Sequence, residues 1–241
     1  MTAPDDELLS VPGLFVTGTD TDIGKTYVTS MIVRRLIRDG IRVGVYKPVC
    51  SGACRDSDGN PRWSDVERLS AAVGDLYPLD RVCPQRFLQP LAPPVAARLE
   101  GRNVDFELLR SAAGWWNDKV ETLVVEGVGG LLCPLTDHKT VADLAADLKL
   151  PLLIVGGTNI GTINHTLLTI EVATRRGLDV AGIVLSQQAP SDDEELIESS
   201  LREIERRTDV AVLGFVPAGG DTVVLNGAVR PVDWQALTRG T

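Results

Sequence analysis

The segment at residues 17–26 constrains the fold of this chain more than any other part of its sequence. It reads TGTDTDIGKT, follows an apolar run at residues 13–16 and precedes a helical pattern at residues 27–38. A glycine-bounded loop that joins a strand to a helix and ends in Gly-Lys-Thr is the arrangement of a phosphate-binding loop, because backbone N–H groups and the helix dipole attract anions there. The segment therefore predicts a nucleoside triphosphate ligand, with Lys25 on its phosphates and the Thr26 hydroxyl on Mg²⁺.

Length and composition indicate an acidic α/β protein. At 241 residues the chain fits one large domain, so we expect residues 1–241 to form a single domain. The net charge of −9 argues against nucleic acid as the main partner. The cysteines at positions 50, 54, 83 and 133 complete no zinc-binding set. Residues 1–10 lack the apolar run of a signal peptide, and no stretch approaches the ~20 apolar residues of a membrane span, so we expect a cytoplasmic location without membrane contact.

Apolar runs alternate with helical patterns along the chain. The runs are near-continuous, as in strands that are buried on both faces, and lie at residues 14–17, 43–46, 122–125, 152–155, 180–185 and 210–215. The helical patterns lie at residues 27–38, 104–117, 162–176 and 191–208. This alternation predicts an α/β fold with a doubly wound, mostly parallel sheet and helices on both faces. Ligands of such sheets bind outside the carboxyl ends of the strands.

Two charged residues end predicted strands. Lys47 ends the second strand, where Pro48 prevents the backbone ladder from continuing. A lysine there can neutralise a transferring phosphoryl group beside the phosphate-binding loop. Glu126 ends the third strand before a glycine-rich run at residues 127–130. An acid in this place can hold Mg²⁺, and the glycines let the backbone approach a substrate closely.

Ser64 and Asp65 admit two interpretations. Ser64 can cap a helix and form a capping box with Glu67. Asp65 can be a ligand of Mg²⁺, which is usually bound through one or two carboxylates together with phosphates. The two interpretations are compatible, because a cap fixes the position of the residue that follows it.

Residues 159–165 stand at a predicted helix start after the fourth strand. Free backbone N–H groups at a helix start can bind a carboxylate. His165 can be catalytic, but a structural histidine is the better interpretation of an isolated histidine. The segment is therefore a candidate site for a carboxylate, and we expect His165 to be structural.

These motifs together resemble the dethiobiotin synthetase family of the P-loop NTPase superfamily. The resemblance extends over residues 14–215 and rests, in order and spacing, on GTDTDIGKT at residues 18–26, YKPVCSG at 46–52, SD at 64–65, VEGVGG at 125–130 and GTINH at 161–165. Five residues separate Gly18 from Gly24, one more than in the common phosphate-binding loop, and this longer loop is the family's form.

The resemblance implies an ATP- and Mg²⁺-dependent ligase. Its reaction converts 7,8-diaminononanoate, CO₂ and ATP to dethiobiotin, ADP and phosphate. One amine forms a carbamate, the γ-phosphate activates the carbamate as a mixed anhydride, and the second amine closes the ureido ring. The resemblance also implies a homodimer that shares the substrate site across its interface.

The resemblance further implies roles for individual residues. The catalytic residues are Lys47, Lys25 and Thr21, and the metal is surrounded by Thr26, Asp65 and Glu126. The nucleotide is bound by Asp22, Ile23, Gly24, Lys25, Thr26, Tyr27, Glu126, Gly127, Ser186, Gln187 and Pro217. The diamine or carbamate is bound by Thr21, Lys47, Ser51 and Gly129, and the substrate carboxylate by Thr162, Ile163 and Asn164 of the partner subunit.

The sequence departs from the family pattern in two places. Asp22 stands where the family often has Glu, which keeps the acid but shortens its reach. Ser186 and Gln187 stand where the family often has Asn-Asp to read adenine. We therefore hypothesise that the choice of nucleotide base is relaxed, with Gln187 or the loop at residues 216–218 supplying the contacts.

Three alternative functions fit the same broad fold. A partitioning-type ATPase switch typically carries an additional lysine at the start of the phosphate-binding loop, but Thr17 precedes Gly18 here. An amidotransferase-linked ligase needs a glutaminase domain, for which the chain leaves no room. A catalytically silent regulatory module is disfavoured by the intact set of Lys25, Thr26, Lys47, Asp65 and Glu126.

Overall fold

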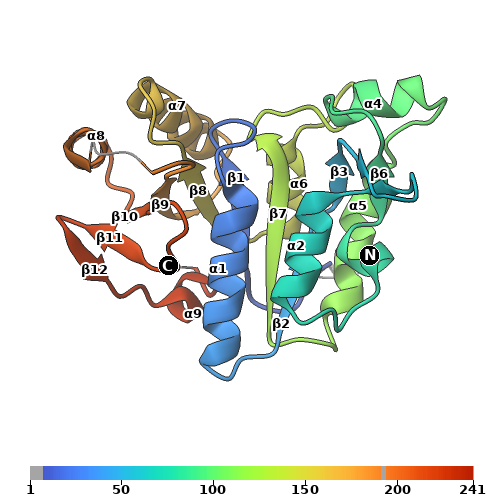
Figure 1. The fold of residues 1–241 in the computed structure, drawn as a ribbon, viewed down its shortest axis with the longest axis horizontal. Coiled ribbons are helices and arrows are strands. Elements are labelled where there is room, and N and C mark those ends of the chain that lie inside the picture. The colour runs from blue at the N-terminus through green and yellow to red at the C-terminus, as the bar shows by residue number, and fades with distance from the viewer. Residues whose placement is uncertain (1–7, 191–193, 241) are drawn as a thin grey trace, which may run out of the picture.

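The computed structural model describes residues 8–190 and 194–240, and an eight-stranded sheet runs through this part of the chain (Figure 1). Its strands, in their order across the sheet, are β12 (Ala228–Arg230), β11 (Val223–Leu225), β10 (Val212–Val216), β9 (Val180–Ser186), β8 (Leu152–Gly156), β1 (Gly13–Gly18), β7 (Thr122–Gly130) and β2 (Val43–Tyr46). The pairs from β10 to β2 are parallel, and β11 and β12 add an antiparallel edge. The mostly parallel sheet that the sequence predicts is therefore confirmed.

Helices cover both faces of this sheet, so the doubly wound architecture is also confirmed (Figure 1). Successive side chains of a strand point to opposite faces, and β1 shows the result. Leu14 and Val16 pack into the core beneath α1 (Lys25–Arg38), α2 (Ser64–Ala72) and α9 (Trp234–Leu237). Phe15 packs on the other face, which is covered by α5 (Phe106–Ser111), α6 (Val141–Leu148), α7 (Thr162–Arg175) and α8 (Glu194–Glu205).

Two predicted elements differ from the structure. The strand predicted at residues 122–125 continues as β7 to Gly130, so Glu126 lies within this strand rather than at its end. The predicted helix at residues 104–117 is shorter and breaks into α5 and a 3₁₀ helix, η1 (Ala112–Trp116). The tighter turn seats the fully buried Trp116 against Gly44 of β2, where a Cβ atom would lie 2.5 Å from the indole. The predicted start of the last helix at Ser191 lies outside the described residues.

The predicted capping box of Ser64 and Glu67 is wrong. Ser64 is the first helical residue of α2, Trp63 occupies the N-cap position, and no side chain caps this helix. Glu67 instead pairs with Arg62, which a hairpin brings beside α2. A capping box does form at α6, where Thr140 and Asp143 bond reciprocally to each other's backbone N–H groups.

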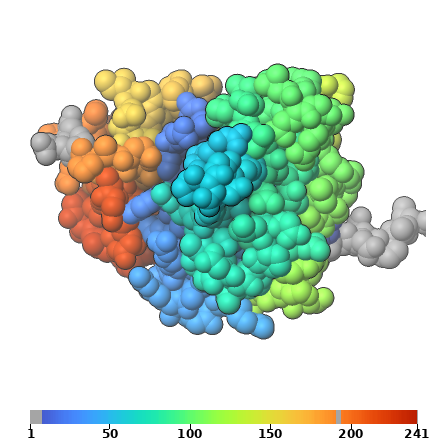
Figure 2. All heavy atoms as spheres, turned by 45° about the vertical axis from the view of Figure 1, so that its right-hand side comes forward, coloured from blue at the N-terminus to red at the C-terminus, as the bar shows by residue number. Residues whose placement is uncertain are grey.

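The segment between β2 and α5 forms small elements around the carboxyl edge of the sheet. They are β3 (Val49–Ser51), which pairs with β6 (Gln85–Phe87), the helices α3 (Leu79–Val82) and α4 (Pro93–Leu99), and the hairpin of β4 (Cys54–Arg55) and β5 (Pro61–Arg62). Figure 2 shows the exposed hairpin as a light-blue projection from the surface. In the described part of the chain, no helix has the length and apolar character needed to cross a membrane.

Candidate functional site

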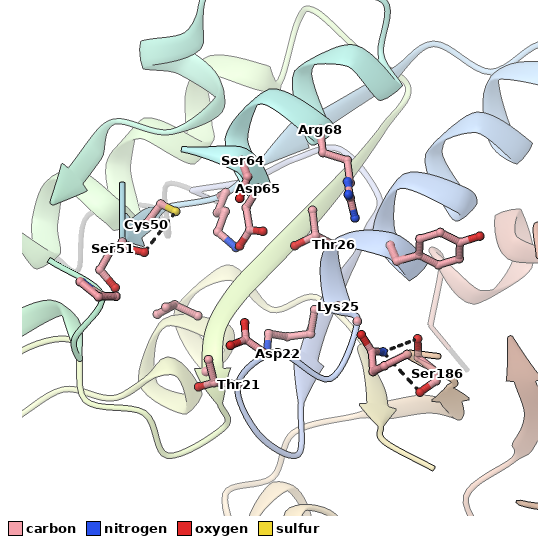
Figure 3. A pocket seen from close by; sticks show the side chains of 18 of the residues that line it. Thr21, Asp22, Lys25, Thr26, Cys50, Ser51, Ser64, Asp65, Arg68 and Ser186 are labelled. Carbon is pink, nitrogen blue, oxygen red and sulfur yellow. Dashed lines mark hydrogen bonds and ion pairs between the residues drawn. The ribbon is translucent and has the colours of Figure 1, made fainter. Parts of the chain in front are cut away.

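A cavity of about 660 Å³ lies at the carboxyl ends of the parallel strands, where the fold class predicts a ligand site. Figure 3 shows its side chains converging from the loop after β1 and from α1, β3, α2 and β9. The charged side chains that line it are Asp22, Lys25, Lys47, Asp65 and Arg68. A cavity of this size, with both signs of charge, suits a polar ligand together with a cation.

The phosphate-binding loop directs the start of α1 into this cavity. Lys25, Thr26 and Tyr27 are the first residues of α1 and line it. Gly24 precedes them in the left-handed conformation, with a φ of 93°. A Cβ atom at Gly24 would lie 2.3 Å from the Oγ atom of Ser186, so only glycine fits. The free N–H groups of the first helical turn therefore face the space where an anion would bind.

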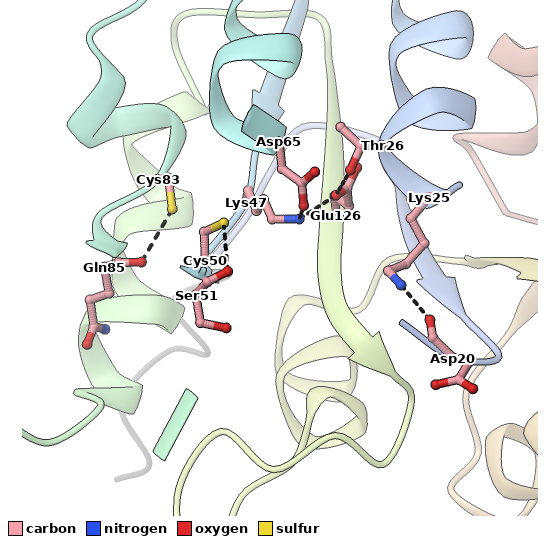
Figure 4. A network of polar contacts seen from close by, with 10 residues as sticks. All are labelled: Asp20, Lys25, Thr26, Lys47, Cys50, Ser51, Asp65, Cys83, Gln85 and Glu126. Carbon is pink, nitrogen blue, oxygen red and sulfur yellow. Dashed lines mark hydrogen bonds and ion pairs between the residues drawn. The ribbon is translucent and has the colours of Figure 1, made fainter. Parts of the chain in front are cut away.

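A buried polar network joins Lys47 to the metal-ligand candidates (Figure 4). The Nζ atom of Lys47 donates to Glu126 Oε1 at 2.5 Å and to Asp65 Oδ2 at 2.8 Å. Thr26 Oγ1 donates to the same Glu126 oxygen at 2.7 Å. Lys47 and Glu126 are 2% and 0% exposed, so the pair is shielded from bulk water. Residues from α1, β7, α2 and the end of β2 thus meet at one point.

The two lysines experience opposite electrostatic environments. Burial alone would lower the pKa of Lys47, but the carboxylates of Glu126 and Asp65 more than offset it and raise this pKa. Burial and the neighbouring Lys47 lower the pKa of Lys25, whose Nζ atom donates to the backbone carbonyl of Asp20 at 2.6 Å. Lys47 is therefore a firmly held cation, whereas Lys25 pairs with no carboxylate among the described residues and is available for an anionic ligand.

The oxygen atoms of Thr26, Asp65 and Glu126 fit a magnesium ion. Hydroxyl and carboxylate oxygens are its preferred protein ligands. Glu126 Oε2 is buried and has no hydrogen-bond partner among the residues described, which leaves it available to a cation. Within residues 8–190 and 194–240, no group of three or more His, Cys, Asp or Glu side chains is arranged to hold a metal. Phosphate oxygens and water would therefore complete the shell of an ion bound here.

Most of the site residues predicted from the sequence meet in this cavity. The lining includes Thr21, Asp22, Gly24, Lys25, Thr26, Tyr27, Lys47, Ser51, Asp65, Gly129, Ser186 and Gln187. Glu126 does not line the cavity itself but accepts hydrogen bonds from Lys47 and Thr26, which do. Ile23, Gly127 and Pro217 are neighbours of lining residues in the chain but do not line the cavity themselves.

The residues predicted to bind the substrate carboxylate lie elsewhere. Thr162, Ile163 and Asn164 begin α7 and are not part of the lining. The Thr162 hydroxyl donates to the carbonyl of Gly157 at 2.7 Å, and Ile163 packs against the core. Asn164 is exposed. Within one chain these residues are therefore separate from the cavity, and their predicted role requires a second subunit.

The end of the cavity near β9 and β10 contains contacts that the sequence did not reveal. Gln187 Oε1 accepts a hydrogen bond from Ala218 N–H at 3.1 Å, and the Tyr27 hydroxyl donates to the carbonyl of Gly220 at 2.5 Å. Gln188 donates to Ser186 Oγ at 3.1 Å. The side-chain oxygen of Gln187 thus accepts a hydrogen bond from the loop after β10. The contact of Gln187 with the nucleotide base stays a prediction.

Sequence analysis missed other lining residues, including Cys50, Cys133, Gln188 and Arg68. Burial raises the pKa of the Cys50 thiol to about 11, so this cysteine stays protonated and is a poor nucleophile. Arg68 follows Asp65 by three residues on α2, a spacing that places two side chains on one helix face. That spacing is the signal that identifies Arg68 from the sequence.

Comparison with known proteins gives the family. The model of the AAA domain family matches residues 12–223. The chain is 46% identical over 205 residues to an ATP-dependent dethiobiotin synthetase of Anaeromyxobacter dehalogenans (strain 2CP-C), covering 85% of this chain and 89% of that protein. It is 39% identical over 208 residues to the protein of that name from Bacillus subtilis (strain 168), covering 85% and 87% of the two chains.

Solved structures give the fold at much lower identity. A ParA family ATPase from Chlorobium tepidum is 13% identical, with a TM-score of 0.51 over 86% of this chain and 85% of that one. A MinC:MinD cell division complex from Aquifex aeolicus contains a chain that is 11% identical, with a TM-score of 0.51 over 95% of this chain and 85% of that one. These likenesses support the P-loop NTPase-like fold and carry no information on the reaction.

Proposed function

The chain belongs to the family of ATP-dependent dethiobiotin synthetases and is an ATP-dependent ligase, and we propose that it converts 7,8-diaminononanoate and CO₂ to dethiobiotin, with ATP split to ADP and phosphate. The observation that carries this proposal is the meeting of the phosphate-binding loop with the buried cation of Lys47. A reaction that passes a phosphoryl group to a small anion needs such a cation beside the terminal phosphate.

The proposed chemistry proceeds in three balanced steps. One amine of the diamine adds to CO₂ and forms a carbamate, releasing a proton. A carbamate oxygen attacks the γ-phosphorus of ATP, and ADP leaves with the electrons of the broken P–O bond. The second amine then attacks the carbonyl carbon of the mixed anhydride and loses a proton, and phosphate leaves with the electrons of the broken C–O bond as the ureido ring closes.

The residues of the cavity support these steps by position and charge. Lys25 neutralises the transferring phosphoryl group, and Lys47 contacts the γ-phosphate and the carbamate in our proposal. Thr21 and Ser51 line the same cavity and contact the diamine or carbamate, with Gly129 leaving space beside Thr21. No enzyme nucleophile is required, so positioning accounts for most of the rate enhancement.

Mg²⁺ fits this proposal through Thr26, Asp65 and Glu126. These residues would hold the ion, which would supply positive charge to offset the charge that develops on the phosphate oxygens. The buried, unpaired Oε2 atom of Glu126 supports this assignment among the described residues. Thr26 and Glu126 are already hydrogen-bonded to each other, so two of the proposed ligands are preorganised.

A homodimer is part of the proposal. The start of α7 lies outside its own chain's cavity, and Ile160 and Leu168 near it are 93% and 56% exposed. We infer that this surface meets a second subunit, where Thr162 and Asn164 and the backbone at Ile163 receive the substrate carboxylate. Cross-linking or sedimentation that finds only monomers at the concentration of the assay would contradict this part.

We also propose that residues 1–241 form one domain that acts in the cytoplasm. Core clusters lie on both faces of the one large sheet, which supports the single domain. All four cysteines are free, as is usual for proteins of reducing compartments. The hypothesis of relaxed base choice is tested by comparing turnover with ATP, CTP and GTP, and strict use of ATP would contradict it.

The deciding experiment measures dethiobiotin directly. The protein is incubated with Mg-ATP and bicarbonate, with and without 7,8-diaminononanoate, and the product is detected by mass spectrometry. We expect diamine-dependent product that disappears in Lys25→Ala and Lys47→Ala. Lys119→Ala, which removes an exposed lysine outside the cavity, is the matched control. ATP hydrolysis without product would favour a partitioning-type switch, and no turnover would favour a silent regulatory module.

A further inference from the structure

The face of α2 that looks into the cavity carries an arginine. Ser64, Asp65 and Arg68 line the cavity, whereas Val66 and Leu69 of the same helix are 1% and 0% exposed in the core beneath α1. These buried side chains fix the rotation of α2 about its axis. Arg68 is therefore held toward the cavity, and Figure 3 shows its side chain directed at the start of α1.

Arg68 differs from the other cations of the cavity in its contacts with the described part of the chain. Lys47 is bonded to two carboxylates, and Lys25 to a backbone carbonyl. In the part of the chain that the structure describes, the Arg68 side chain makes no hydrogen bond, ion pair or ring contact. The same cavity contains a phosphate-binding loop. A bound anionic ligand would therefore supply the partner that the guanidinium lacks.

We propose that the guanidinium of Arg68 binds the phosphate chain of the nucleotide. A planar guanidinium presents paired N–H donors that match two phosphate oxygens, and such charge-assisted pairs are stronger than neutral hydrogen bonds. Arg68 lies above Thr26 in Figure 3, on the side of the cavity away from Ser51. That position favours the nucleotide over the diamine as its partner. The inference rests on the proposed ATP-dependent function.

The role of Arg68 is separate from that of the two lysines. Lys25 and Lys47 lie where the transferred phosphate is expected, whereas Arg68 is on the exposed rim of α2. Arg68 therefore contributes to nucleotide affinity, and phosphates that ATP and ADP share are its expected partners. Its loss should raise the dissociation constants of both nucleotides by a similar factor and leave turnover at saturating ATP nearly unchanged.

The test is calorimetric titration of ATP and ADP, with Mg²⁺, into the full chain and its variants. Arg68→Ala should weaken both nucleotides about tenfold or more, as expected for loss of a hydrogen bond to a charged group. Arg68→Lys keeps the charge but not the planar fork and should restore only part of the affinity. Arg34→Ala removes an exposed arginine of α1 that does not line the cavity. It should change affinity less than about threefold, as a surface charge does.

Four results would overturn the inference. The first is an Arg68→Ala variant that binds ATP as tightly as the wild type. The second is an Arg34→Ala variant that weakens ATP binding as much as Arg68→Ala does, which would leave only a long-range effect of charge. A higher KM for the diamine with unchanged nucleotide affinity would assign Arg68 to the substrate instead. Wild-type protein that binds no ATP would overturn the proposed function as well, whereas wild-type binding that Arg68→Ala leaves intact overturns this inference alone.

Discussion

Lys47 and Glu126 form a buried ion pair. We therefore predict that removing the charge of only one of them lowers the free energy of unfolding strongly. Lys47→Met keeps the length of the side chain but removes the cation from a position that is 2% exposed. Glu126, at 0% exposure, would then hold a buried charge whose remaining hydrogen bond comes from the Thr26 hydroxyl. Burying an uncompensated carboxylate is unfavourable because water no longer solvates it.

The magnitude follows from the burial of the two partners. Removing one member of a buried ion pair typically costs about 3–5 kcal/mol, and we expect the lower end because Glu126 keeps the hydrogen bond from the Thr26 hydroxyl. Glu126→Gln should cost less, about 1–3 kcal/mol, because Lys47 keeps the carboxylate of Asp65 at 2.8 Å. The double variant buries no unpaired charge, so the two effects should fall short of additivity by about 2 kcal/mol or more.

Urea unfolding of the wild type, both single variants and the double variant completes this cycle. The titrations use tryptophan fluorescence in metal-free buffer without nucleotide, and an unchanged m value indicates that the variants unfold from comparable states. Asp65→Asn is the control: the Asp65 side chain is 44% exposed, so its loss should cost less than about 1 kcal/mol. Additive effects, or a loss below about 1 kcal/mol in Lys47→Met, would refute the reasoning.

Three further predictions concern other parts of the fold. Gly24→Ala should abolish ATP binding in a filter or calorimetric assay, because its Cβ atom would lie 2.3 Å from a β9 hydroxyl; Gly59→Ala, with φ of 82° but open space around it, should bind normally. Tyr46→Phe should lower the free energy of unfolding by about 1–2 kcal/mol, because its buried hydroxyl donates to an α5 carbonyl at 2.6 Å. Asp143→Ala should cost about 1 kcal/mol at neutral pH through loss of the α6 cap. Burial would raise the Asp143 pKa, but hydrogen bonds from Thr140 bring it below its ordinary 3.8, so this stability is present above pH 3.8 and should disappear as acid titration proceeds below it. An Asp143→Ala deficit that is constant with pH would contradict the last prediction.

Local sequence was sufficient to predict the elements whose residues have a strong preference of their own. The strand at residues 43–46 is predicted and observed with the same bounds, because its apolar residues are buried on both faces. The phosphate-binding loop was also predictable, because Gly24, Lys25 and Thr26 are consecutive residues. Their effect on the loop and on the start of α1 is therefore local. Lys47 and Glu126 follow predicted strands, which placed both at the carboxyl edge of the sheet, where the structure joins them at 2.5 Å.

Local sequence was insufficient where distant segments compete for the same group. Glu67 has the spacing of a capping box, yet Arg62 on the neighbouring hairpin takes its carboxylate. Trp116 has a helical pattern around it, yet packing against Gly44 favours a 3₁₀ turn. In both cases the local structure depends on a residue from another segment. The pattern of residues within the segment itself does not give the position of that residue.

The sequence by itself indicated the ligand class, the parallel sheet and most of the polar residues at its carboxyl edge, because glycine conformations, hydrophobic patterns and strand ends are properties of adjacent residues. Only the tertiary structure decided which of the charged side chains pair with each other and which remain available for a ligand. It paired Lys47 with Glu126 across β2 and β7, left Lys25 and Arg68 available for an anion, and separated the start of α7 from the cavity. Electrostatic pairing depends on distance and burial, and both are set by packing between segments that lie far apart in the chain.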